Sequence, residues 1–150
     1  MTPEPKDLLR GASRTLTDVV LPALGDPFAI EQVKTVLRVL AHLEAVVDEA
    51  YPLEAAEAAD LGRFLGEVAR STDPALASLG SDDPLPSASP LPPYRELRDA
   101  NVQRKRGVTE VIRALARGAS DPKIQAALDD LTRRQLGRER RWTNPGRPSK

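Results

Sequence analysis

The spacing of the apolar residues constrains the fold of this chain more than any other feature of its sequence. Between residues 28 and 51 they recur every three or four positions, which is the period of one helical face. No stretch shows the strict alternation of a half-buried strand. The sequence therefore predicts an all-α protein, and the width of this stripe predicts a central helix with neighbours on both sides. The stripe consists of Val33, Val36, Leu37, Leu40, Leu43 and Val47.

Proline and glycine divide the chain into five predicted helices. The second is expected to begin at Asp26-Pro27, with Asp26 as N-cap, and to end before Pro52, because a residue that precedes proline avoids helical backbone angles. Gly118 is expected to close the fourth helix. The five helices are predicted over residues 2–24, 28–51, 53–70, 94–117 and 122–141.

Between the third and fourth helices the composition changes. Residues 71–93 hold six prolines and five serines and show no periodicity, so they predict a long Pro/Ser-rich connector, either strapped over the surface or disordered. We expect residues 1–70 to form a three-helix segment and residues 94–141 to complete one bundle with it. Residues 142–150 are basic and contain two prolines, which predicts a flexible tail.

The composition excludes several classes of protein. The chain of 150 residues has no Cys and one His, which excludes a disulfide scaffold, a thiolate zinc site and a site with several His ligands. No apolar run approaches the length needed to span a bilayer, and the polar, Pro-rich start shows no secretory signal, so we expect a cytoplasmic protein without membrane contact. His42 has no nucleophile motif or orienting acid assigned to it. We predict a non-catalytic protein with no cofactor and no metal site.

The formal net charge of zero conceals two unlike halves. Residues 1–90 carry 7 basic and 15 acidic groups, whereas residues 91–150 carry 15 basic and 7 acidic groups. The halves could form two faces with separate partners, or they could pack against each other with attracting rims. The acidic groups between residues 48 and 60 are better interpreted as helix-start charges and rim partners than as metal ligands.

The fourth helix carries an unusual heptad seam, because two of its positions are polar. Asn101 and Arg104 interrupt the apolar residues. A buried Asn can set the register of two helices and a buried Arg needs a paired acid, or else this part of the seam forms the wall of a groove that receives a partner. We predict a partner-binding surface at Asn101, Arg104, Lys105 and Arg106. The seam consists of Leu97, Asn101, Arg104, Val108, Val111 and Leu115.

The C-terminal arginines suggest a second hypothesis, a helical protein that binds nucleic acid. Trp142 lies among them, and Gly146-Arg147-Pro148 matches part of a minor-groove hook, although no convincing helix-turn-helix precedes it. Such binding would weaken steeply with salt. The residues concerned are Arg133, Arg134, Arg138, Arg140, Arg141 and Arg147.

Two stretches of the chain carry a family resemblance. They are residues 7–24 with the helix that follows, and residues 112–121 with a last helix that leads into Asn144-Pro145. Together they resemble a bacterial family of small all-helical proteins, a domain of unknown function encoded beside aminoglycoside-phosphotransferase-like kinases and acyl-CoA dehydrogenases. The resemblance implies a small accessory subunit of such a kinase, in the metabolism of hydroxyacyl-CoA substrates. A homo-oligomer formed through the second or fourth helix is the remaining alternative.

Overall fold

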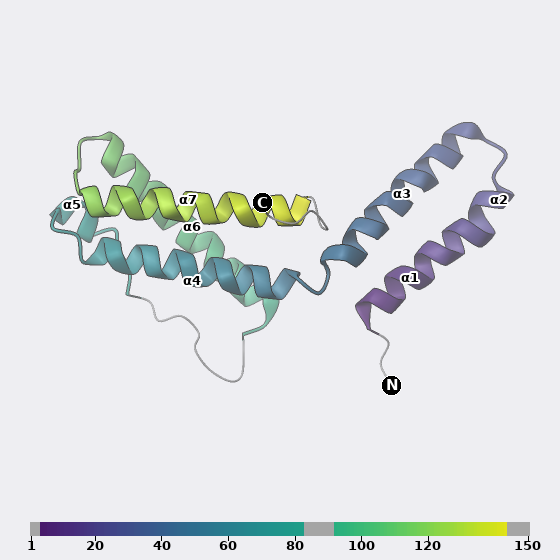
Figure 1. Ribbon diagram of the computed structural model, residues 1–150, viewed down its shortest axis with the longest axis horizontal. Coiled ribbons are helices and arrows are strands. Elements are labelled where there is room, and N and C mark those ends of the chain that lie inside the picture. Colours follow the sequence, from purple (N-terminus) through teal and green to yellow (C-terminus); the bar gives the residue numbers. More distant parts are fainter. Residues whose placement is uncertain (1–3, 83–91, 144–150) are drawn as a thin grey trace. The chain divides into compact units, whose positions relative to one another are not determined.

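The computed structural model describes residues 4–82 and 92–143 (Figure 1). Within these residues the chain forms helices and no strand, which confirms the all-α prediction. The chain divides into two compact units, and each is described by itself. The first consists of Met1–Ala50 with Arg141–Lys150, and the second of Tyr51–Arg140. The packing of all five helices into a single bundle stays a prediction.

The first unit contains a helical hairpin. Its first arm is α1 (Pro5–Thr15), which continues through a π-helical turn, η1 (Leu16–Val20), into the short α2 (Leu21–Ala23). Its second arm is α3 (Pro27–Val46). Asp26 caps α3, because its carboxylate accepts hydrogen bonds from the backbone N–H groups of Phe28 and Ala29, as the sequence predicts. The predicted start at Thr2-Pro3 lies outside the described residues.

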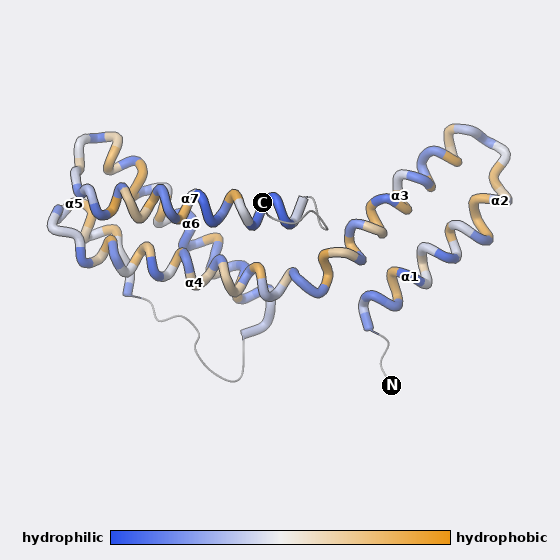
Figure 2. The backbone as a smooth tube through the Cα atoms, viewed as in Figure 1, coloured by the Kyte–Doolittle hydropathy of each residue, from blue (hydrophilic) through white to orange (hydrophobic). Residues whose placement is uncertain are grey.

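Two ion pairs show that the arms of the hairpin are antiparallel. Arg10 Nε lies 2.6 Å from Glu44 Oε1, and Lys6 Nζ lies 3.1 Å from Asp48 Oδ2. The residue number rises along one arm as it falls along the other. Hydrophobic positions recur along both arms (Figure 2). No residue of α1 is buried, however, and Val46 is the one buried residue of α3. The hairpin therefore has no closed core of its own.

The second unit has a hydrophobic core. It is built by α4 (Ala50–Ala69), α5 (Pro74–Ala77), α6 (Tyr94–Ala116) and α7 (Pro122–Thr143), as far as these helices lie within residues 51–140. The apolar residues that recur at helical spacing on α4, Leu61, Phe64, Leu65 and Val68, are buried. On α7, Ile124 and Leu131 are buried, whereas Leu136 is exposed. The core consists of Leu61, Phe64, Leu65, Val68, Leu76, Val108, Val111, Ile124 and Leu131.

Two predicted boundaries are wrong. The second predicted helix ends at Val46 rather than near Tyr51, and α4 begins at Ala50, so that Pro52 lies in its first turn. A proline fits there because the first N–H groups of a helix have no intrahelical acceptor to lose. The connector also contains α5, although no periodicity predicted a helix there. Residues 83–91 of the connector lie outside the described residues.

Two aspartates join the turn before α5 to the turn before α7. Asp73 caps α5 by accepting from the N–H of Ala75, and it also accepts from the N–H of Ser120. Asp121 accepts from the Ser71 hydroxyl at 2.7 Å and from the N–H of Lys123. Each carboxylate thus serves its own turn and the opposite one, which fixes the two turns to each other.

Candidate functional site

α6 carries the predicted partner-binding residues, and the structure separates them into an inner and an outer group. Asn101 is 1% exposed. Its Nδ2 donates to the main-chain oxygen and to Oε1 of Glu54 on α4, both at 2.9 Å, and its Oδ1 accepts from Arg104 Nη1 at 3.2 Å. Of the two interpretations of the polar seam, a buried Asn that sets the register of two helices is the one that fits Asn101. This side chain joins α6 to α4 and presents no surface to a partner.

The two cations that follow Arg104 lie toward solvent. Lys105 Nζ pairs with Glu57 Oε2 at 2.9 Å and stays half exposed, and Arg106 Nη1 donates to Gln103 Oε1 at 3.4 Å. Arg104 itself is half-buried. A role for these three residues in binding a partner stays a prediction.

The exposed side of α6 also carries large apolar residues. Val102 is 42% exposed and Ile112 is 47% exposed. Lys105, Arg106 and Thr109 are exposed as well, and all five lie on one side of the helix, because they are spaced by three or by one along the chain. We call this set the outer α6 face. It combines apolar contact area with positive charge.

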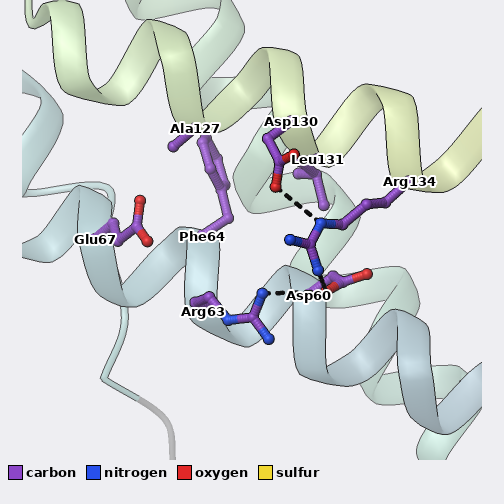
Figure 3. A pocket seen from close by; sticks show the side chains of 8 residues that line it. All are labelled: Asp60, Arg63, Phe64, Glu67, Ala127, Asp130, Leu131 and Arg134. Atoms are coloured by element: carbon purple, nitrogen blue, oxygen red, sulfur yellow. Dashed lines mark hydrogen bonds and ion pairs between the residues drawn. The ribbon is translucent and has the colours of Figure 1, made fainter.

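The strongest polar cluster in the described part of the second unit surrounds Asp60, which is 9% exposed (Figure 3). Its carboxylate accepts from Arg63 Nη1 at 3.5 Å, from Arg134 Nη1 at 3.3 Å and from Arg138 Nη1 at 2.5 Å. Asp130 also pairs with Arg134, at 2.8 Å, and its hydrogen bond and charge raise the pKa of that guanidinium above its ordinary value, with Asp60 adding to the effect. The cluster fixes α7 to α4.

A small cavity of about 60 Å³ adjoins this cluster, between Phe64 on α4 and Leu131 on α7. It is too small for an organic substrate, because ligand pockets usually measure at least about 300 Å³. Two nitrogens of the Arg138 guanidinium, Nε and Nη2, are buried without a hydrogen-bond partner. In the sequence Asp60 is one of several acids between residues 48 and 60, and nothing local distinguishes it from the others. The sequence signal for this cluster is the spacing of four residues between Arg134 and Arg138, because it places both side chains on the same side of α7.

The arginines of the nucleic-acid hypothesis are bonded to neighbouring groups of the chain. Arg134 and Arg138 pair with Asp60, Arg141 pairs with Glu49 at 3.1 Å, and Arg133 Nε donates to the main-chain oxygen of Asp129. Arg140 is exposed, and Arg147 lies outside the described residues. Pairing with acids lowers the positive potential that these arginines could offer to phosphates.

These ion pairs also bear on the charge asymmetry of the chain. Lys105 with Glu57, Arg138 with Asp60 and Arg141 with Glu49 each join a basic residue of the second half to an acidic residue of the first. Each pair lies within one of the two compact units. The interpretation of the acids as rim partners is therefore confirmed for these pairs.

The single histidine packs against the single tryptophan. The rings of His42 and Trp142 meet edge to face, with centroids 6.3 Å apart and an interplanar angle of 88°. Both residues belong to the first unit. Across residues 4–82 and 92–143, no group of three or more His, Cys, Asp or Glu side chains is arranged to hold a metal ion. No helix in the same ranges has both the length and the apolar character for crossing a membrane.

No family model, curated protein or solved structure matches the chain. The resemblance to the kinase-associated family therefore stays a prediction.

Proposed function

We propose that this protein is a non-catalytic accessory subunit of a phosphotransferase-like kinase in the cytoplasm, and that the outer α6 face binds the enzyme. The observation that supports the proposal is the character of this face. Val102 and Ile112 stay exposed although apolar side chains of this size usually gain from burial, and Lys105 and Arg106 lie between them. Such a surface fits a partner with an apolar groove and an acidic rim.

The identity of the partner comes from the resemblance stated above. Members of that family are encoded beside phosphotransferase-like kinases, and the substrates implied are hydroxyacyl-CoA compounds. A subunit of this kind needs a firm helical scaffold and an exposed contact surface rather than reactive groups. The second unit offers both, because its core holds α6 while the outer α6 face remains accessible.

The experiment that tests the proposal is affinity purification of the intact tagged chain from its native cytoplasm, followed by mass spectrometry. We expect a phosphotransferase-like kinase to co-purify in near-stoichiometric amount. The double substitution Val102→Glu with Ile112→Glu should reduce its recovery at least about tenfold, because it places two charges in the apolar contact. Leu136→Glu is the matched control, since Leu136 is exposed to a similar extent on α7.

Two results would contradict the proposal. One is a purification in which no such kinase appears. The other is equal recovery of the kinase by the α6 variant and by the Leu136→Glu control. If the kinase does co-purify, its activity toward hydroxyacyl-CoA substrates should be measured with and without the chain.

A further inference from the structure

The hairpin of the first unit carries an apolar stripe that neither of its arms covers. On α3, Val33, Leu37 and Leu40 are partly buried along the side that faces α1. Beside these partly buried residues, α3 carries a second row of apolar side chains, and the first arm carries a similar row. The side chains of these two rows are between 40% and 71% exposed. We call these residues the open stripe. They are Leu8, Val19, Phe28, Val36, Val39 and Leu43.

The two arms turn the open stripe toward the same side of the hairpin. In each arm an exposed residue comes one position before a partly buried one: Leu8 precedes Leu9, and Val39 precedes Leu40. One position is a rotation of about 100° about the helix axis. The rotation has the same sense along both chains and the arms are antiparallel, so the exposed residues of both arms point to one face. This face is continuous across the hairpin.

We propose that this face binds the same face of a second copy of the chain, so that two hairpins form an antiparallel four-helix bundle. The area agrees with this occupant. Six large apolar side chains at these exposures offer roughly 600 Å² per copy, and a symmetric pair would therefore bury roughly 1,200 Å², which is the lower end of the range for stable interfaces. A hairpin without a closed core needs such a partner to cover its apolar face.

The two ion pairs also fix which residues of the two arms lie at the same level. Lys6 pairs with Asp48 and Arg10 with Glu44, so residues whose numbers sum to about 54 lie level. Val19 on the first arm therefore lies within one helical turn of the level of Val36 on α3, and Leu8 lies within one turn of the level of Leu43.

This level arrangement is self-complementary about a two-fold axis parallel to the helices. Such an axis keeps the levels and sets each α1 arm on α3 of the other copy. The axis brings Leu8 and Val19 of each copy to within one helical turn of the level of Leu43 and Val36 of the other, so the apolar side chains of the two open stripes meet at matching levels.

The test is the mass of the intact protein in solution, measured by sedimentation equilibrium over about a hundredfold range of concentration. We expect a reversible dimer of twice the 16.3 kDa chain. Val36→Glu with Val39→Glu should raise the dissociation constant at least about tenfold, because four carboxylates would enter the apolar contact. Leu136→Glu, which changes an equally exposed residue outside the hairpin, should leave it unchanged. Circular dichroism shows whether each variant keeps its helix content.

Several results would overturn the proposal. A monomer at every concentration is one, whether the open stripe then proves to be covered by the rest of the same chain or by another protein. A dimer that the stripe substitution leaves unchanged is another, because it must form through a different surface. The test is independent of the kinase proposal, since Val102→Glu should leave the dimer intact.

Discussion

At the scale of single residues, the buried carboxylate of Asp60 in the second unit depends strongly on its cationic partners. Its buried carboxylate accepts hydrogen bonds from guanidinium groups on α4 and on α7. A buried acid of this kind is stabilised only while its cationic partners are in place, and the partners in turn depend on it. Arg138 depends most on it, because the rest of its guanidinium is buried.

Asp60→Asn should therefore lower the free energy of unfolding by about 2–3 kcal/mol, because it leaves the largely buried guanidinium of Arg138 without its counter-charge. Glu67→Gln is the matched control, since it removes the same charge from an exposed position beside the same cavity. Urea denaturation followed by circular dichroism measures both. Equal effects of the two substitutions would show that only net charge matters here.

Asp121 gives the chain a pH dependence of known sign. The Ser71 hydroxyl, and to a lesser degree backbone N–H groups, stabilise the charged carboxylate and hold its pKa below the ordinary value. A group with a lowered folded-state pKa stabilises the fold above the pKa of an unfolded aspartate, about 3.9, and loses that contribution as the pH falls through the folded-state pKa.

We therefore expect stability to fall at acid pH, and we expect Asp121→Asn to remove part of that fall while keeping an N-cap for α7. Urea midpoints at a series of pH values below neutrality measure the slope. Asp82→Asn is a suitable comparison, because this exposed aspartate pairs with an exposed arginine. If stability depends on pH in the same way in Asp121→Asn and in the parent chain, the attribution of this pH dependence to Asp121 is wrong.

At the scale of elements, two glycines of this protein have different effects. One permits close packing between segments, and the other only lowers the helix propensity of its helix. A Cβ on Gly80 would overlap the backbone N and Cα of Ala69 at the end of α4. Gly137 on α7 has open space around the same position. The first glycine permits the chain after α5 to pass directly over α4, and the second weakens its helix without a packing reason.

Gly80→Ala should destabilise the protein by about 1–3 kcal/mol, because the backbone of the turn must move away from α4. Gly137→Ala should instead stabilise it by up to about 1 kcal/mol, since alanine has the higher helix propensity. Thermal unfolding of both variants beside the parent chain measures the difference. Two shifts of the same sign would contradict the close approach at Gly80.

At the scale of the whole molecule, the two units differ in how much apolar surface they cover. Residues 51–140 include every member of the hydrophobic core cluster. The hairpin lacks a comparable core. We expect the isolated fragment 51–140 to be helical and to unfold in one cooperative transition, which calorimetry and circular dichroism can check. A fragment 4–50 should be helical only where self-association covers its apolar face, so its helix content should rise with concentration.

The pairing of the C-terminal arginines makes a further prediction for the whole chain. We expect only weak, salt-sensitive binding to duplex DNA, because Arg134, Arg138 and Arg141 are paired with acids. Fluorescence anisotropy at a series of salt concentrations measures it. Tight binding that persists at physiological salt would revive the nucleic-acid hypothesis.

The sequence by itself determined the helices of this protein and the inward face of α4, whereas Val36 and Leu43 of the predicted stripe on α3 are exposed. Leu61, Phe64 and Leu65 are buried as the helical period predicts, and Asp26 caps α3 as predicted, because period and capping depend on neighbours along the chain. The end of α3 at Val46 was missed, since a proline restricts a boundary without fixing it: Pro52 fits the first turn of a new helix as well as the end of an old one.

Only the tertiary structure decided which polar residues meet. Asn101 could have lined an open groove or set a register, and the choice depended on Glu54, which lies 47 residues earlier. Asp60 and Arg138 are separated by 78 positions, and no local pattern links them. Contacts over such separations follow from how helices pack, and packing is set by the summed shape of the apolar faces rather than by any short stretch of sequence.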